Sequence, residues 1–332
     1  MGVTFFLPGG AVADALRDLD PDAAPNAFQR GEDAWILQTY IRLKRAGNEV
    51  ELVESPPENG VVIFHGKHAR ALLRHRKRMK DVVLVGVRGD LREVSLADIE
   101  VLQNGRFADG IRRIFIPHWP QPGLIPRDRR RGATITRVAY KGFSGNLHRA
   151  FGSREWVDFL TSLSIAWDID AARFQGQAML GHTLAWHDYS TVDLVLAVRP
   201  HDRRLHTPKP ATKLVNCWRA GVPALLGPEY AYRELRRSEL DYIEIASLAD
   251  AKAAVTRLAV DPGLYRAMVA NGERRAAEFT NDEILKHWAA LLYETLPSLC
   301  ESRHGRLARH TPILVRRLVR RLPRLLPWRP AR

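Results

Sequence analysis

Cysteine is scarce in this sequence of 332 residues, which contains only Cys217 and Cys300. Two cysteines cannot build a disulfide framework, and the spacing between them does not match that of a metal site. Such low usage is typical of proteins from a reducing compartment. We therefore expect a cytoplasmic protein that binds no metal.

Long apolar runs are also absent. No run approaches the ~20 residues that a membrane-spanning helix requires. Residues 1–10 lack the basic start and the long apolar stretch of a secretory signal. The composition, with 45% hydrophobic and 27% charged residues, is that of a folded soluble protein. We expect neither secretion nor a segment that spans the bilayer.

Acidic residues are missing from the C-terminal segment 303–332, which holds ten arginines and no Asp, Glu or Lys. The formal net charge of the chain is +14, so these arginines leave only +4 on the rest. The basic composition therefore describes a tail, and single-sign tails are commonly interaction segments. No zinc spacing, helix-turn-helix signal or RNA-recognition signature is present, so we expect no specific nucleic-acid partner.

The tail has an amphipathic pattern between Pro312 and Pro323. Arginines and apolar residues fall on opposite sides of a helix there, which predicts a short basic amphipathic helix. Such a helix can lie in an anionic bilayer surface, whereas RNA binding and disorder are the alternatives. The apolar side is formed by Leu314, Val315, Leu318, Val319 and Leu322, and the basic side by Arg316, Arg317, Arg320 and Arg321.

Apolar runs of strand length alternate with longer amphipathic stretches in both halves of the chain. This alternation is typical of βα units with a mostly parallel sheet, and the runs are continuous, as expected where helices cover both faces of a sheet. A chain of this length is expected to form two domains. The sequence therefore predicts an α/β protein, with strands at 3–7, 49–53, 61–64, 82–87 and 114–116, then at 137–140, 165–169, 194–198, 222–226 and 242–245.

The pattern breaks at 117–132, where four prolines precede a run of charged residues. Prolines exclude a regular helix or a central strand, so we expect an interdomain linker in this stretch. The domains expected on this basis are a first domain at 1–130, a second domain at 131–280, a C-terminal helix at 281–300 and the arginine-rich tail at 301–332.

The second half contains a candidate anion site between a strand and a helix. The apolar strand 194–198 leads into a polar loop that ends at Pro210, and the following helix ends at Gly221. Ligands of open parallel sheets bind at the carboxyl ends of strands, where the N-termini of helices attract phosphate. We therefore expect an anion to bind at 199–212.

Several side chains of this loop and helix suit a nucleoside diphosphate. Lys209 and Lys213 supply positive charge, Thr212 supplies a hydroxyl, and Arg199 directly follows the strand. Asn216, one turn into the helix, is placed to reach a ribose hydroxyl. Lysines near a helix start are also often merely solvated, so both interpretations stay open here.

The stretch Lys209–Gly227, KPATKLVNCWRAGVPALLG, resembles the donor-binding segment of GT-B glycosyltransferases, above all the large retaining family called group 1. Gly221-Val222-Pro223 supplies the Gly-x-Pro ending of that segment. Asp193 stands where the family has an acidic residue before a strand, and 261–280 is similar to its late helix and Phe-Thr turn. A fainter similarity covers the first half, from the strand that ends in His65 onward.

The resemblance implies a GT-B architecture, in which two Rossmann-like domains face each other across a cleft and a basic C-terminal tail follows. It implies a hexosyltransferase-like enzyme that uses a nucleotide-sugar as substrate, without a cofactor or an obligatory metal. The expected acceptor is a cell-envelope polysaccharide or a lipid-linked glycan. Together with the tail, this predicts a peripheral protein at the inner face of the cytoplasmic membrane.

The sequence also departs from the family pattern. Many members carry two glutamates where this chain has Pro208 and Asn216, so a catalytically decayed binding or scaffold protein is the alternative function. Lys141 stands where an arginine is frequent, followed by Gly142 in a loop that can approach a pyrophosphate. The resemblance thus implies donor binding by Lys141, Gly142, Arg199, Lys209, Thr212, Lys213 and Asn216.

Four further residues are candidates for the chemistry. His65, Asp90 and His118 each follow a strand end, where either histidine could orient or deprotonate an acceptor hydroxyl. Glu229 follows Gly227-Pro228 and could approach the sugar. Structural roles are the alternatives: a hydrogen-bonded histidine at 65, a turn residue at 90, a hinge brace at 118 and a helix start at 229.

Overall fold

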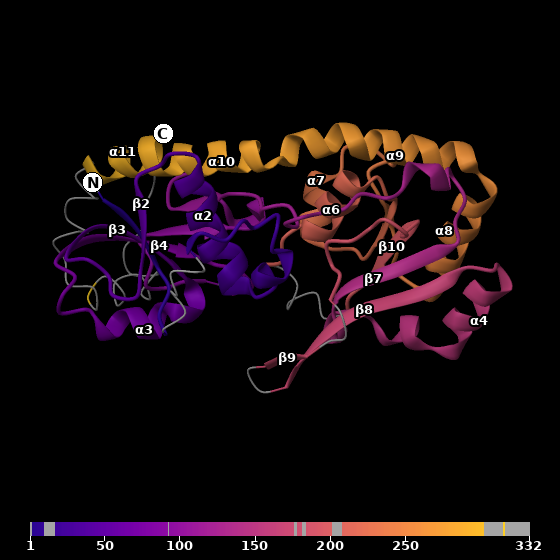
Figure 1. Cartoon of the computed structure of the whole chain (residues 1–332), viewed down its shortest axis with the longest axis horizontal. Coiled ribbons are helices and arrows are strands. Elements are labelled where there is room, and N and C mark those ends of the chain that lie inside the picture. The colour runs from indigo at the N-terminus through magenta and orange to yellow at the C-terminus, as the bar shows by residue number, and fades with distance from the viewer. Residues whose placement is uncertain are drawn as a thin grey trace. The chain divides into compact units, whose positions relative to one another are not determined.

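The computed structural model describes residues 2–9, 17–91, 93–175, 178–180, 184–200, 208–301 and Val315. The chain divides into two compact units (Figure 1). Unit 1 comprises Met1–Pro21, Ala27–Pro117 and Ile284–Arg332, and unit 2 comprises Asp22–Asn26 and His118–Glu283. The expected linker, 117–132, thus lies in unit 2 from His118 onward, and the boundaries at 130 and 280 stay predictions.

Unit 1 is built on a parallel sheet of six strands in the order β2-β1-β3-β4-β5-β6. The chain starts in the interior of the sheet and extends it on both sides of β1, which is the arrangement of doubly wound α/β domains. The strands are β1 (Val3–Phe6), β2 (Val50–Val53), β3 (Asn59–His65), β4 (Asp81–Val87), β5 (Ile99–Leu102) and β6 (Arg113–Phe115).

Successive side chains of β1 point to opposite faces of this sheet. Phe5 packs against Tyr40 of α2 (Gln38–Arg45), which continues the π-helix Asp33–Leu37, while Phe6 belongs to a cluster with Leu72 of α3 (Ala69–Arg74). α2 and α3 therefore cover opposite faces (Figure 1). The continuous apolar runs of the first half arise from this double coverage.

The chain returns to unit 1 at its C-terminal end. α10 (Asn281–Ala290) is followed by a π-helical turn (Leu291–Thr295) and α11 (Leu296–Glu301). Trp288 of α10 is fully buried and lies against Phe5, with ring centroids 6.4 Å apart. None of the described helices combines the length and the apolar character needed to cross a bilayer. The predicted tail at 303–332 lies outside the described residues, apart from Val315.

Unit 2 has a second sheet in the order β12-β11-β10-β7-β8-β9, which is parallel except for β9. β7 pairs with β8 on one side and with β10 on the other, so the winding direction reverses between β7 and β10. The strands are β7 (Arg137–Phe143), β8 (Ala166–Gln175), β9 (Ala178–Leu180), β10 (Leu194–Ala197), β11 (Ala224–Leu226) and β12 (Ile243–Glu244).

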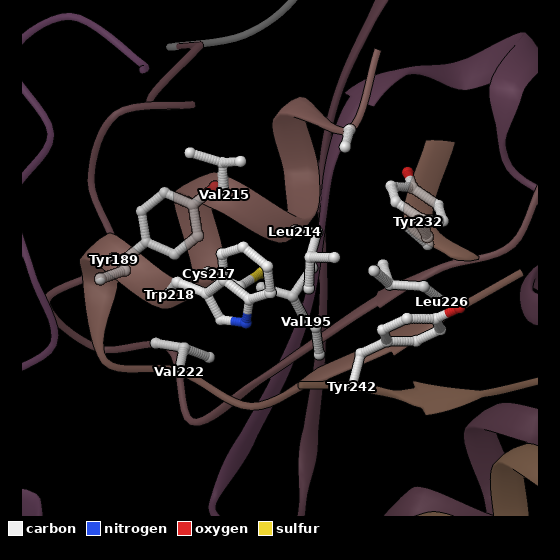
Figure 2. Packing of buried hydrophobic residues seen from close by; sticks show 14 of the residues in the cluster. Tyr189, Val195, Leu214, Val215, Cys217, Trp218, Val222, Leu226, Tyr232 and Tyr242 are labelled. Atoms are coloured by element: carbon white, nitrogen blue, oxygen red, sulfur yellow. The ribbon is translucent and has the colours of Figure 1, made fainter. Parts of the chain in front are cut away.

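Helices cover both faces of this sheet as well. Figure 2 shows Leu214 and Trp218 of α6 (Thr212–Ala220) packed toward Val195 of β10 and toward Leu226 of β11. Leu194 belongs instead to the cluster on the opposite face, with residues of α4 (Arg154–Ser162), α8 (Leu248–Val260) and α9 (Pro262–Ala276). The alternation along β10 separates the two cores.

These observations confirm the predicted α/β class with two parallel sheets. Two of the described helices begin with side-chain caps, because Asp261 accepts a hydrogen bond from the amide of Leu264 (2.9 Å) and Thr280 from that of Glu283 (3.2 Å). Strands β5 and β9 were not predicted. β5 is short, and it carries the charged residue Glu100, which is unusual in a buried strand. The carboxylate of Glu100 accepts a hydrogen bond from Arg88 (3.1 Å), which follows β4, and the folded sheet brings these two residues together.

A buried carboxylate joins the start of unit 2 to its sheet. Asp193, fully buried directly before β10, accepts bonds from both Arg127 (2.7 Å) and Arg131 (2.8 Å) and from the amides of Thr136 (2.8 Å) and Arg137 (3.0 Å). Burial by itself raises the pKa of Asp193, but these bonds outweigh it and hold the pKa below its usual value. Arg127 and Arg131, from the charged run after the prolines, therefore have a structural role. We call their bonds to Asp193 the Asp193 clamp.

We expect Asp193→Asn to lower the free energy of unfolding by about 3–5 kcal/mol, because it leaves two guanidinium groups without their carboxylate in a buried site. Urea denaturation followed by circular dichroism measures this change. The control is Asp158→Asn, since Asp158 forms a solvated pair with Arg154 and its loss should cost no more than ~0.5 kcal/mol. Equal effects of the two changes would contradict the clamp.

Candidate functional site

The carboxyl ends of β7, β10 and β11 meet at one edge of the sheet of unit 2. Gly142 lies at the end of β7, Arg199 follows β10, and Glu229 follows β11 and precedes α7 (Tyr230–Leu235). α6 begins beyond β10 with Thr212 and Lys213. This is the edge at which the winding reverses, and ligands of open α/β sheets bind outside the strand ends at such a point.

Lys213 is a cation of this edge whose pKa is strongly lowered. Its half-buried Nζ lies 5.6 Å from the ring centroid of Tyr140 and would be 2.9 Å from a Cβ built at Gly142. Among the described residues no carboxylate lies within ion-pair distance of it. Burial, and next the charge of Arg199, lower the pKa of Lys213 to about 8. Lys213 is thus a half-buried ammonium that forms no ion pair with any acid in the part of the chain that the structure describes.

Arg199 and Glu229 form a buried ion pair beside Lys213. Nη1 of Arg199 donates to Oε2 of Glu229, and the side chains are only 11% and 7% exposed. The other carboxylate oxygen of Glu229, Oε1, is buried and accepts no hydrogen bond from any residue that the structure describes. The electrostatic fields of both residues reach Lys213 and Tyr140. Glu229 therefore offers one unused acceptor to a ligand at this edge.

Two other predicted donor residues border the start of α6. Thr212 is the first residue of the helix, and Lys209 precedes it; both are half-buried. The expected anion loop lies only in part within the described residues, because 201–207 falls outside them. The helix start and its two flanking lysines are thus the described part of the predicted phosphate site.

Asn216 and Lys141 have partners within the protein. The buried Asn216 accepts a hydrogen bond from the amide of Gln121 (3.1 Å), which ties α6 to the segment after His118. Nζ of Lys141 donates to Asp170 (3.2 Å) of β8 and to a backbone carbonyl (2.8 Å). Each residue therefore has a structural role, while contact of either one with a donor stays a prediction.

His65 and Asp90 lie in unit 1, beyond the ends of β3 and β4. His65 is 2% exposed, and its Nδ1 accepts from the amide of Lys67 (3.3 Å). Its Nε2 would be 2.4 Å from a Cβ at Gly89, whose φ is +57°, so only glycine fits there. Burial lowers the pKa of His65 to about 4, and the ring is neutral at pH 7. Asp90 directly follows Gly89, and its side chain is exposed.

His118 begins the main segment of unit 2 and is half-buried. Its Nδ1 bonds the carbonyl oxygen of Trp119, and because a carbonyl only accepts, Nδ1 carries the proton. This fixes the tautomer with Nε2 unprotonated in the neutral ring. The predicted part of His118 in the chemistry stays untested.

The residue that sequence reasoning missed is Tyr140. Its ring lies beneath Lys213, and its hydroxyl donates to the carbonyl of Phe143 (2.6 Å) at the end of β7. Burial raises its pKa far above the usual value, so the hydroxyl keeps its proton. The available signal was its position two residues before Gly142, which puts both on one face of the strand.

No family model and no curated protein matches the sequence. Solved structures share its fold. Alr3699/HepE of Anabaena, in complex with UDP and glucose, superposes with a TM-score of 0.52 at 14% identity, covering 90% of this chain and 100% of that chain. A glycosyltransferase from Rickettsia africae gives a TM-score of 0.52 at 7% identity, covering 89% and 99%.

The pneumococcal O-GlcNAc transferase GtfA, in complex with UDP and GlcNAc, gives a TM-score of 0.51 at 12% identity. The match covers 79% of this chain and 60% of GtfA, so this chain corresponds to only part of that protein. Identities this low show the fold alone. The fold predicted from the resemblance, that of GT-B glycosyltransferases, is thereby confirmed.

We expect Gly142→Ala to lower the free energy of unfolding by about 1–3 kcal/mol, because its φ is +149° and the new methyl would meet the Lys213 ammonium and the Tyr140 hydroxyl. The matched control is Gly145→Ala, three residues further on, where a methyl meets open space and φ is not positive. Chemical denaturation of both variants tests the contact. A loss no larger than that of the control would show that Lys213 does not lie there.

Proposed function

We propose that this protein is a glycosyltransferase that takes its sugar from a nucleotide-sugar and transfers it to a cell-envelope polysaccharide or a lipid-linked glycan. The observation that carries the proposal is the cluster of Lys213, Arg199 and Glu229 at the winding reversal of unit 2. A sheet edge with an unpaired ammonium at a helix start suits a ligand of concentrated negative charge, as a diphosphate is.

Sugar transfer leaves a nucleoside diphosphate behind, so negative charge grows on the leaving phosphate in the transition state. Lys213 would bind that charge in a site of low polarity, where an ammonium stabilises an anion more than it does in water. The free amides of the first turn of α6, at Thr212 and Lys213, would add hydrogen bonds. These groups need no metal, and we propose that none is obligatory.

The ion pair would act beside this cation. Its net charge is close to zero, so the pair does not cancel the positive charge of Lys213. Glu229 would fix the guanidinium of Arg199 toward the phosphates, while its free Oε1 accepts a hydrogen bond from a sugar or ribose hydroxyl. Lys209, Gly142, Lys141 and Asn216 complete the proposed donor set.

The donor class is supported by the bound ligands of two structures with this fold. HepE was solved with UDP and glucose, and GtfA with UDP and GlcNAc. A nucleoside diphosphate sugar is accordingly the donor that we propose for this chain. Hydrolysis of a panel of nucleotide-sugars would identify the sugar.

The acceptor would bind to unit 1. His65 is unprotonated at neutral pH, as a residue that accepts a hydrogen bond from an acceptor hydroxyl must be. A pKa near 4 makes it a weak base, so we assign it the orientation of that hydroxyl and leave proton abstraction to Asp90 of the same unit. The protein would be cytoplasmic and would attach to the inner face of the membrane by its arginine-rich tail.

We expect Lys213→Met to weaken the binding of UDP or of another nucleoside diphosphate by at least tenfold, because one close phosphate–ammonium contact is lost. Isothermal titration with a panel of nucleoside diphosphates measures this, and hydrolysis of the matching nucleotide-sugars measures turnover. The control is Lys252→Met, since Lys252 pairs with Glu155 on the opposite face of the sheet. If no nucleotide binds the wild type, the decayed-scaffold alternative holds.

The same binding should depend on pH. With its pKa near 8, Lys213 is charged at pH 7 and loses its proton as the pH rises through about 8, so affinity should fall between about pH 7 and about pH 9.5. Lys213→Met should bind weakly and without this fall. A wild-type affinity that is constant across the range would remove Lys213 from the site.

For the tail, we expect the combined change of Arg316, Arg317, Arg320 and Arg321 to glutamine to weaken the binding of the full chain to anionic vesicles at least tenfold. Each cation at such a surface contributes up to ~1 kcal/mol. Cosedimentation with phosphatidylglycerol vesicles, beside neutral phosphatidylcholine vesicles, gives the measurement. Unchanged binding would exclude the tail as the anchor.

A further inference from the structure

A second basic segment lies in the body of the protein, on unit 1. Residues 67–80 contain seven lysines and arginines and no Asp or Glu. The segment consists of a 3-10 turn, α3 and two successive turns that lead into β4. Although the chain without its tail carries only +4, its charges are strongly segregated at this place.

Three side chains anchor the segment to the sheet. Leu72 and Met79 are buried in the cluster that contains Phe6, and the ring of His75 lies edge-on to Phe6 with centroids 6.0 Å apart. Because these residues hold the helix and the turns by one side, the other side faces solvent. The exposed side chains on it are Arg70, Arg74, Arg76, Lys77 and Arg78, which we call the α3 basic patch.

The α3 basic patch has one acid near it, Glu58, which interacts electrostatically with Arg78. Among the residues that the structure describes, none of its five cations has a carboxylate within ion-pair distance. The nearby Glu58 is bonded to Lys80 at 3.0 Å. Cations on a protein surface are ordinarily interspersed with acids, so five cations with a single acid beside them create a strong local positive potential.

We propose that the α3 basic patch is a docking surface for the head groups of an anionic phospholipid bilayer, separate from the arginine-rich tail. Clusters of four to eight Lys and Arg are the sequence pattern typical of binding to anionic lipid head groups, and each cation near the surface contributes about 1 kcal/mol. The apolar residues Leu72 and Met79 point into the core, so the attraction is electrostatic and should weaken as salt shortens the Debye length.

Chemistry favours a membrane over other anionic partners. Single-stranded nucleic-acid sites combine cations with aromatic side chains that stack on bases, and residues 67–80 contain no Phe, Tyr or Trp. α3, with six residues, is also too short to fill a groove. Protein interfaces have an apolar centre within a polar rim, whereas this patch exposes cations throughout.

The α3 basic patch is tested in the full chain with the four tail arginines, Arg316, Arg317, Arg320 and Arg321, changed to glutamine in every protein, so that the tail does not mask it. The patch variant adds R74Q, R76Q, K77Q and R78Q. The control variant adds instead four exposed changes on unit 2 that remove the same charge, R149Q, R154Q, R257Q and R266Q.

Cosedimentation uses vesicles with about one-third phosphatidylglycerol in phosphatidylcholine, at low and at physiological salt. Each cation multiplies the partition coefficient about fivefold, so the patch variant should lose at least about 100-fold and the control variant little. All proteins should keep their melting temperature and nucleotide affinity, because the changed side chains are exposed and outside the donor site. Retention of these two properties separates failure of the patch from failure of the proposed transferase activity.

Three results would overturn the proposal. One is equal vesicle binding by the patch variant and its tail-neutral parent, and another is an equal loss in the control variant. The third is that the parent does not bind anionic vesicles but does bind single-stranded RNA through the patch, which would assign the surface to nucleic acid.

Discussion

The buried carboxylate of Asp193 is the interaction on which the donor-side geometry depends. It lies before β10, and its bonds to Arg127, Arg131 and the start of β7 fix the two central strands of unit 2 in register. A buried charge is tolerated only when it is paired and hydrogen-bonded, and these donors meet that condition. The carboxyl ends of β7 and β10, which carry Gly142 and Arg199, take their positions from this clamp.

The cations at that edge differ in whether they are paired with an acid of the protein, and an unpaired cation can bind a ligand. Lys141 is bonded to Asp170, and Arg199 to Glu229, whereas Lys213 lies over the face of Tyr140 and has no carboxylate within ion-pair distance among the described residues. An ammonium over an aromatic ring is partly stabilised by the ring, but it is not neutralised. The positive charge of Lys213 is therefore available to an anionic ligand, and that charge is the physical basis of the proposed donor site.

Electrostatics also shapes the rest of the surface. The net charge of the body is small, yet the α3 basic patch concentrates five unpaired cations within nine residues. Net charge is a sum over the molecule, whereas a membrane responds to the local potential within a Debye length. An enzyme that acts on lipid-linked acceptors would benefit from such a surface, because it raises the residence time at the bilayer.

The sequence by itself determined the βα order and the strand ends near which the candidate residues lie, because these follow from local periodicity. Only the tertiary structure decided which of those side chains have partners. Asn216 is bonded to Gln121, ninety-five residues away, and Glu229 pairs with Arg199 across two strands. Such pairings depend on strand order and register, which bring together residues that no local pattern links, and so Tyr140 beneath Lys213 escaped prediction.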